Sequence, residues 1–148
     1  MFFLKDLPTR QMIEGYVTTL EAGDEDAIET ALIMMRDASV LVRRIDQYFQ
    51  AENLSQLRFL IMIVIDREPE RPWLYQGEVA ERLDVSKPVL TRAVQSLMDA
   101  GLLTVSPDED DKRWKRLSLS PDGTKRLHAL LPGYFQLISD FMADRKGG

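Results

Sequence analysis

The stretch that decides the fold runs from Ser86 to Arg113 and reads SKPVLTRAVQSLMDAGLLTVSPDEDDKR. Its first half predicts a helix over residues 86–100. Ser86 is a residue type that caps free N–H groups, Pro88 is tolerated in a first turn, and Gly101 is typical of the position after a helix end. Apolar residues at helical spacing predict one buried face, made of Val89, Ala93, Leu97 and Ala100.

The opposite face of this expected helix is polar, and no acid occurs between Lys87 and Met98. It carries Ser86, Lys87, Thr91, Arg92 and Gln95. Lysine and arginine contact phosphates or guanine edges, while threonine and glutamine read bases. The alternative is that this face is simply exposed to solvent and does not contact DNA.

The pattern changes after Gly101. Leu103 and Val105 alternate with Leu102 and Thr104, residues 106–111 (SPDEDD) have turn composition, and residues 114–120 (WKRLSLS) alternate again. This predicts a β-hairpin over residues 102–120 with a charged tip, in which Trp114 packs on the strand rather than on a base. A charged hairpin without a nucleic-acid role is the alternative.

A second helix is expected immediately upstream, over residues 76–83 (QGEVAERL). Asp84 and Val85 then turn the chain into Ser86, so two short helices meet at a tight turn and the second presents polar side chains. With the hairpin behind them, these elements predict a winged helix-turn-helix. Residues 73–75 fit a short third strand, although Tyr75 stands where Ser or Thr would normally cap the following helix.

Residues 77–103, followed by DKRWKRLSLSPDG (residues 111–123), resemble the MarR family of bacterial transcription regulators. The shared pattern is Gly101-Leu102 after the helix, Asp-x-Arg in the wing (Asp111-Lys112-Arg113) and Leu119-Ser120 before the closing helix. The resemblance covers about a third of the chain. It implies a homodimer that binds double-stranded DNA at a palindromic operator, more often as a repressor than as an activator.

The resemblance also implies roles for single residues. Pro88 joins the DNA-binding set at the start of the recognition helix, and Lys112 and Arg113 join it at the hairpin tip. Arg113 would enter a narrow minor groove, oriented by Asp111. The chain departs from the family pattern because Thr104, Val105 and Ser106 occupy positions where an arginine often pairs with the wing acid. Lys115 or Arg116 is then the candidate partner for Asp111.

The helices outside this unit are expected to be long and apolar on one side. Predicted helices cover residues 10–22, 24–51 and 54–66, and a closing helix begins at Ser120-Pro121-Asp122. Pro132-Gly133 should kink or split that closing helix, with a last helix over residues 134–144. We therefore expect a mainly α protein in which residues 1–53 and 121–148 form a helical dimerisation region around a DNA-binding lobe at residues 54–120. A monomer that folds its terminal helices onto itself is the alternative.

The excess negative charge lies outside the predicted lobe. The chain has 148 residues and a net charge of −5, and all of that excess falls within residues 1–53. No apolar run reaches the length of a membrane span, so we expect a cytoplasmic protein that has no membrane partner. Local basic patches rather than net charge decide phosphate contact, although an acidic chain also fits a winged helix that binds protein instead of DNA.

A small aromatic or phenolic effector is a further partner that the resemblance implies. Side chains that suit such a pocket are Met12, Tyr16, Met35, Arg43, Arg44 and Trp73, although methionine and aromatic stripes are more often plain core. No cysteine is present and His128 is the only histidine, which argues against thiol chemistry and a zinc site. With no nucleophile–base set and no phosphate-binding glycine loop, we expect neither an enzyme nor a cofactor.

Overall fold

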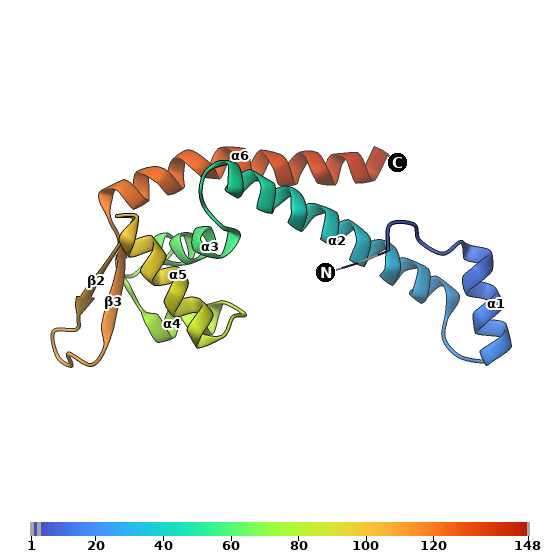
Figure 1. Ribbon diagram of the computed structural model, residues 1–148, viewed down its shortest axis with the longest axis horizontal. Helices are drawn as coiled ribbons and strands as arrows, with labels where there is room; N and C mark the ends of the chain where they lie inside the picture. The colour runs from blue at the N-terminus through green and yellow to red at the C-terminus, as the bar shows by residue number, and fades with distance from the viewer. Residues whose placement is uncertain (1, 3, 148) are drawn as a thin grey trace. The chain divides into compact units, whose positions relative to one another are not determined.

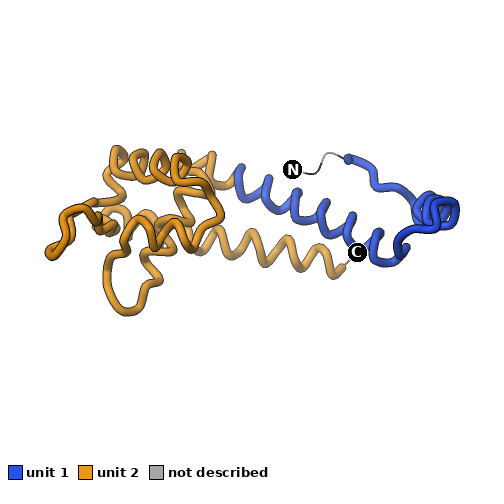
Figure 2. The backbone as a smooth tube through the Cα atoms, turned by 90° about the horizontal axis from the view of Figure 1, so that it is seen from below, with its two compact units in different colours: residues 1–47 blue, residues 48–148 orange. Residues whose placement is uncertain are grey.

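The computed structural model describes residues 2 and 4–147. Its two compact units are residues 1–47 and residues 48–148 (Figure 2). The predicted limits at residues 1 and 148 lie outside the described residues. Among those residues, no helix combines the length and apolar character needed to cross a membrane.

The first unit contains α1 (Arg10–Leu20) and most of α2 (Glu25–Ala51), close to the two helices expected from the sequence. Thr9 caps α1 through its side chain, and the Asp24 carboxylate accepts a 2.7 Å hydrogen bond from the Ala27 N–H at the start of α2. Asp24 thus satisfies one of the free donors in the first turn of α2. The turn between the helices uses Gly23 at φ +93°, a conformation that favours glycine.

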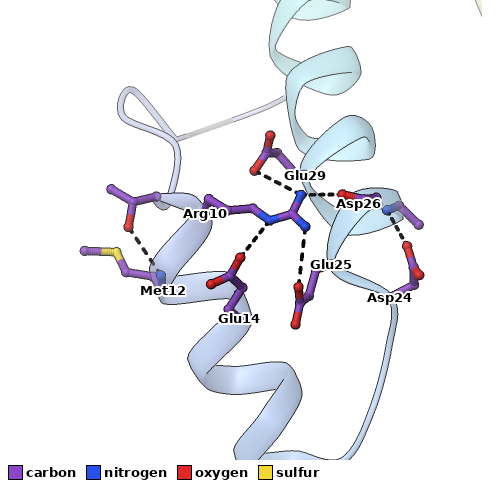
Figure 3. A network of polar contacts seen from close by, with 9 residues as sticks. Arg10, Met12, Glu14, Asp24, Glu25, Asp26 and Glu29 are labelled. Atoms are coloured by element: carbon purple, nitrogen blue, oxygen red, sulfur yellow. Dashed lines mark hydrogen bonds and ion pairs between the residues drawn. The ribbon is translucent and has the colours of Figure 1, made fainter.

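A single arginine joins these two helices (Figure 3). The Arg10 guanidinium bonds to Glu14 on its own helix at 3.1 Å and contacts three carboxylates at the start of α2: Glu25 at 3.4 Å, Asp26, and Glu29 at 3.8 Å. Acids in the first turn of a helix also interact favourably with its dipole. Arg10 therefore fixes α1 against the α2 N-terminus and offsets part of the local negative charge.

The second unit is the winged helix-turn-helix with the long closing helix. Its elements are α3 (Gln56–Asp66), β1 (Leu74–Tyr75), α4 (Gln76–Arg82), α5 (Lys87–Asp99), β2 (Leu103–Pro107), β3 (Lys115–Leu119) and α6 (Pro121–Gly147) (Figure 1). The strands form an antiparallel sheet in the order β1-β3-β2. The predicted fold class, mainly α with a β-hairpin wing, is confirmed.

The core of this unit lies where α3, α5, α6 and the sheet meet. Phe49, Phe59 and Tyr134 form a ring cluster, with the Phe49 and Phe59 centroids 4.5 Å apart. Leu97 of α5 and Leu117 of β3 are fully buried. Because α5 and the wing share one packed core, their positions relative to each other are fixed.

The start of α6 packs tightly on the end of α5. Ser120 caps α6 as predicted, since its hydroxyl accepts from the Gly123 N–H at 2.9 Å and donates to the Gly101 carbonyl at 2.6 Å. The backbone at Gly123 approaches the Leu102 carbonyl so closely that a Cβ would overlap it. Glycine is therefore required at position 123 by contact rather than by backbone angle.

The expected break near Pro132-Gly133 does not divide α6 into two helices, because one helix runs from Pro121 to Gly147 with Pro132 inside it. Proline removes one hydrogen bond from the helix ladder. Here the Tyr48 hydroxyl donates to the Leu130 carbonyl at 2.7 Å, and the absence of a side chain at Gly133 makes room for the Tyr48 ring. The N–H that Pro132 lacks would have bonded the His128 carbonyl, so the Tyr48 hydroxyl adds a hydrogen bond near that gap and does not replace the lost one.

Candidate nucleic-acid interface

The solvent face of α5 carries the polar residues that the sequence predicted for it. Leu90, Ala93, Val94 and Leu97 are buried and hold the helix against the core. The predicted DNA-binding residues of this segment are all exposed: Ser86, Lys87, Pro88, Thr91, Arg92 and Gln95. The structure therefore gathers six predicted residues on or beside one helix face that solvent reaches.

The predicted buried face of α5 was partly wrong. Val89 and Ala100 are exposed, and Leu90 and Val94 are buried in their place. Each helical residue turns the chain by about 100°, so a spacing rule alone accepted two positions at the border of the stripe. Val89, 37 % exposed, is consequently a residue that the sequence reasoning missed on the interface, and it suits contact with a thymine methyl group.

Two of these polar side chains, Thr91 and Gln95, are hydrogen-bonded to neighbouring residues. Gln76 Nε2 donates to Thr91 Oγ1 at 3.3 Å, and Gln95 Nε2 donates to Asp99 Oδ1 at 2.8 Å. Ser86 has extended backbone angles at the N-cap, yet its side chain makes no capping hydrogen bond. A cap bonds the second or third N–H of a helix. Pro88 occupies the second position and has no N–H, and the Ser86 side chain does not bond the third N–H, that of Val89, either, so the predicted side-chain cap is absent.

The tip of the wing presents Arg113. Its side chain is 88 % exposed, and its guanidinium bonds the Asp111 carboxylate through Nε at 3.0 Å and Nη2 at 2.7 Å. This pairing holds the pKa of Asp111 below its usual value. Lys112, next to it, is also exposed. The paired guanidinium has five N–H donors, so donors remain for a second partner.

A buried acid inside the wing was not predicted. Asp108 is 6 % exposed, and its Oδ1 accepts from Tyr75 Oη and from Arg116 Nε, both at 2.8 Å. Its Oδ2 accepts from the N–H groups of Asp110 and Asp111 at 3.2 Å each. The Tyr75 hydroxyl, followed by Arg116 and the two N–H groups, lowers the pKa of Asp108 to about 2.

Arg116 therefore pairs with Asp108. The sequence had instead suggested Arg116 as a candidate partner for Asp111. Arg116 is the register partner of Tyr75 on β1, so the two side chains lie on the same face of the sheet. Asp111 bonds Arg113 instead. The acid-rich run 108–111 gives no sequence signal for which carboxylate turns inward. The one hint is that an aspartate at the start of a turn often accepts hydrogen bonds from N–H groups that follow it.

Aromatic rings cover the base of the wing. The Trp73 ring lies under two guanidinium groups, with Arg71 4.5 Å and Arg116 4.1 Å from its centroid. Trp114 is 53 % exposed and meets Tyr75 edge-on at 5.2 Å. These cation–π and edge contacts stiffen the side of the sheet from which the hairpin extends. Trp114 packs as predicted, with half of its surface still exposed.

Comparison with known proteins identifies the kind of winged helix. The model of the MarR family matches residues 52–113, which includes α3, α4, α5 and the wing as far as Arg113. Residues 52–113 are thus similar to the MarR family. The prediction made from Gly101-Leu102 and Asp111-Lys112-Arg113 is therefore confirmed.

Similar proteins extend the likeness to the helices that flank these residues. The HTH-type transcriptional repressor YetL of Bacillus subtilis is 29% identical over 140 residues, which cover 94% of this chain and 83% of that protein. AbsC of Streptomyces coelicolor, a MarR family transcriptional regulator, has a TM-score of 0.74 at 16% identity, over 83% of this chain and 82% of its own. Sco3205 from the same organism, solved in complex with DNA, has a TM-score of 0.72 at 20% identity, over 82% and 74% of the two chains.

The predicted effector residues fall in both units. Met35 and Arg43 of α2 line a cavity of about 660 Å³ that also has Phe2, Val42 and Asp46 in its wall. Tyr16 lines a separate apolar cavity between α1 and α2, of about 330 Å³. Met12 and Arg44 are exposed, and Trp73 lies in the second unit against Arg71 and Arg116. The structure thus brings together Met35 and Arg43 in one cavity wall.

Among the described residues, no group of three or more acidic or histidine side chains is placed to hold a metal ion.

Proposed function

We propose that this protein is a double-stranded DNA-binding transcription regulator that acts as a repressor by occupying a palindromic operator as a homodimer. The observation that carries the proposal is the exposed polar face of α5 beside a wing whose tip presents Arg113, 88 % exposed. The family match over residues 52–113 supports it, as do the repressor name of YetL and the DNA complex of Sco3205.

In this proposal α5 enters the major groove, which is wide enough for a helix. Arg92 and Gln95 lie one turn apart on its exposed face and reach base edges, and Lys87 contacts a phosphate near the helix N-terminus. Arg113 enters the neighbouring minor groove, where a narrow, strongly negative channel attracts guanidinium groups. A dimer then contacts two half-sites whose centres are about 34–36 Å apart.

The homodimer is proposed from apolar residues that remain exposed on the helices outside the lobe. In the first unit these are Met12, Tyr16, Leu20, Met34, Met35 and Val42. Apolar surface that stays exposed on a helix is typical of interaction sites when it is contiguous. We accordingly assign residues 1–53 and 121–148 to dimerisation and residues 54–120 to DNA binding.

A small aromatic acid is proposed as the effector that releases the operator. The cavity beside Met35 and Val42 offers apolar walls, and Arg43 at its rim provides a cation for a carboxylate. Titration of the DNA complex with salicylate as a probe tests this part of the proposal. Release by wild type but not by Arg43→Gln is the expected result, and equal release by both contradicts it.

Selection of bound duplexes from a random DNA pool, at two salt concentrations, tests the main proposal. We expect a recovered palindrome with half-sites about one helical turn apart, and affinity that falls steeply with salt because phosphate contacts release counterions. No enrichment, or binding indifferent to salt, would instead favour the second candidate, a winged helix that binds another protein, which the acidic net charge keeps open.

Two substitutions then test the contacts. Arg92→Ala and Arg113→Ala should each weaken operator binding by about tenfold, since a base-edge or groove contact is worth on the order of 1–3 kcal/mol. Lys146→Ala, which removes an equal charge from the last turn of α6, is the matched control and should leave affinity within about twofold. Unchanged affinity in both arginine variants would refute the assigned grooves.

A further inference from the structure

Asp108 differs from the other acids of the wing in its burial. The tip carries four consecutive acidic residues, 108–111. Glu109 and Asp110 are exposed and Asp111 is partly exposed, whereas Asp108 is 6 % exposed. An acid is rarely buried unless its charge is paired and hydrogen-bonded. The contacts of Asp108 therefore indicate its role in the wing.

The Asp108 carboxylate connects the base of the wing to its tip. Through Oδ1 it accepts from Tyr75 of β1 and from Arg116 of β3. Through Oδ2 it accepts from the backbone N–H groups of Asp110 and Asp111. We call Asp108, Tyr75 and Arg116 the wing clasp. One end of the clasp is anchored outside the hairpin, because Tyr75 directly precedes α4 and its N–H donates to Glu78 of that helix at 3.1 Å.

The other end of the clasp leads to Arg113. Asp108 fixes the backbone of Asp111 at 3.2 Å, and the Asp111 carboxylate accepts from both the backbone N–H of Arg113, at 3.1 Å, and its guanidinium. A chain of hydrogen bonds therefore runs from α4 through Tyr75, Asp108 and Asp111 to a side chain that is 88 % exposed.

We propose that Asp108 is a positioning residue for DNA binding, which holds the wing so that Arg113 reaches the minor groove while Asp108 itself stays off the DNA. This inference rests on the proposed function. It differs from a purely structural role because its effect on DNA must pass through Arg113. It also differs from direct electrostatics, because an acid near phosphates would by its charge alone oppose binding.

The positioning and electrostatic explanations predict opposite changes in DNA affinity for Asp108→Asn. The substitution keeps the size of the side chain and removes one negative charge, so electrostatics alone predicts tighter DNA binding. Positioning predicts the opposite, a loss of about tenfold for the selected operator, comparable to the loss of the Arg113 contact. Glu109→Gln is the matched control: it makes the same charge change at the next, exposed residue and should bind as tightly as wild type or slightly tighter.

A double-mutant cycle tests whether the effect passes through Arg113. In an Arg113→Ala background, Asp108→Asn should cause less than about a twofold further loss. Because guanidinium groups prefer narrow A·T-rich minor grooves, Asp108→Asn should also reduce the preference for A·T over G·C base pairs under the wing. A loss of equal size in both backgrounds, or affinity and flank preference equal to those of Glu109→Gln, would overturn the proposal.

Thermal unfolding of each variant shows whether the fold persists. If Asp108→Asn is unfolded, Tyr75→Phe takes its place, since it deletes one hydrogen bond and keeps the ring against Trp73 and Trp114. It should weaken binding in the same direction, by less, and only when Arg113 is present. Wild-type protein that shows no salt-dependent DNA binding would overturn the proposed function itself. Failure of the positioning role alone gives a different result. Wild type would then still bind the operator, and the double-mutant cycle would show no coupling between Asp108 and Arg113.

Discussion

Replacing Gly123 by alanine should destabilise the protein, although the same change in a helix normally stabilises it. Gly123 lies in the first turn of α6, and a Cβ there would overlap the carbonyl oxygen of Leu102. That oxygen accepts the Ser120 N–H at 3.1 Å, so it belongs to the bonded turn between β3 and α6. The obstacle is backbone, which cannot rotate away as the end of a flexible side chain would.

Two opposing terms set the size of the effect. Alanine gains about 0.5–1 kcal/mol over glycine in a helix, because the unfolded chain loses less freedom. Forcing packed atoms apart costs about 1–3 kcal/mol, and the obstacle at Gly123 places it at the upper end of that range. The net result is a loss of about 2 kcal/mol in the free energy of unfolding for Gly123→Ala.

Gly77→Ala is the matched control for this prediction. Gly77 lies in the first turn of α4, and nothing lies within 4 Å of a Cβ built there. This variant should gain up to about 1 kcal/mol. Urea unfolding at a fixed protein concentration measures both, since a dimer's stability depends on concentration. Two variants that shift the unfolding midpoint in the same direction, or a Gly123→Ala protein as stable as wild type, would refute the close-contact explanation.

Two further measurements test the hydrogen bonds described above. Tyr48→Phe should cost about 1 kcal/mol of unfolding free energy, because it removes the hydroxyl that bonds the Leu130 carbonyl beside Pro132; an unchanged urea midpoint would contradict this role. Acid should lower the free energy of unfolding between about pH 4 and pH 2. On folding, the pKa of Asp108 falls from 3.8 to about 2, and Arg71 lowers the pKa of Glu78. The stabilisation from these two carboxylates is therefore complete above their unfolded pKa and is lost as the pH falls through their folded pKa. Asp108→Asn should show a shallower loss over that window, and an equally steep loss would contradict the assignment.

The sequence predicted the order of the elements because their signals are local. The ends of α2 were predicted to within a residue, and Ser120-Pro121 marked the start of α6. These positions are determined by caps, glycines and apolar spacing within a few residues of each other. The arginine at the hairpin tip followed in the same way, from a short motif whose spacing is preserved.

What the sequence could not predict depends on contacts between distant residues. The hydrogen bond from Tyr48 to the Leu130 carbonyl joins residues 82 positions apart, and no local rule for α6 takes account of such a contact. Leu90 and Val94 of α5 are buried because α3 and the sheet lie on their side of the helix. Periodicity gives the existence of an apolar face, but tertiary packing decides which border residues belong to it.

The wing shows why an acidic run can accompany a DNA-binding role. Four successive acids at the tip would repel phosphates if all of them faced the duplex. In the structure Asp108 is turned inward onto Tyr75 and Arg116, and Asp111 is paired with Arg113. Two of the four charges are thereby matched by guanidinium groups, and the exposed Arg113 keeps donors for a second partner. Net charge per segment, which is what a sequence reports, therefore understates the capacity of this hairpin to approach a phosphate backbone. What matters is which acid is bonded to which arginine: Asp108 is paired with Arg116, and Asp111 with Arg113.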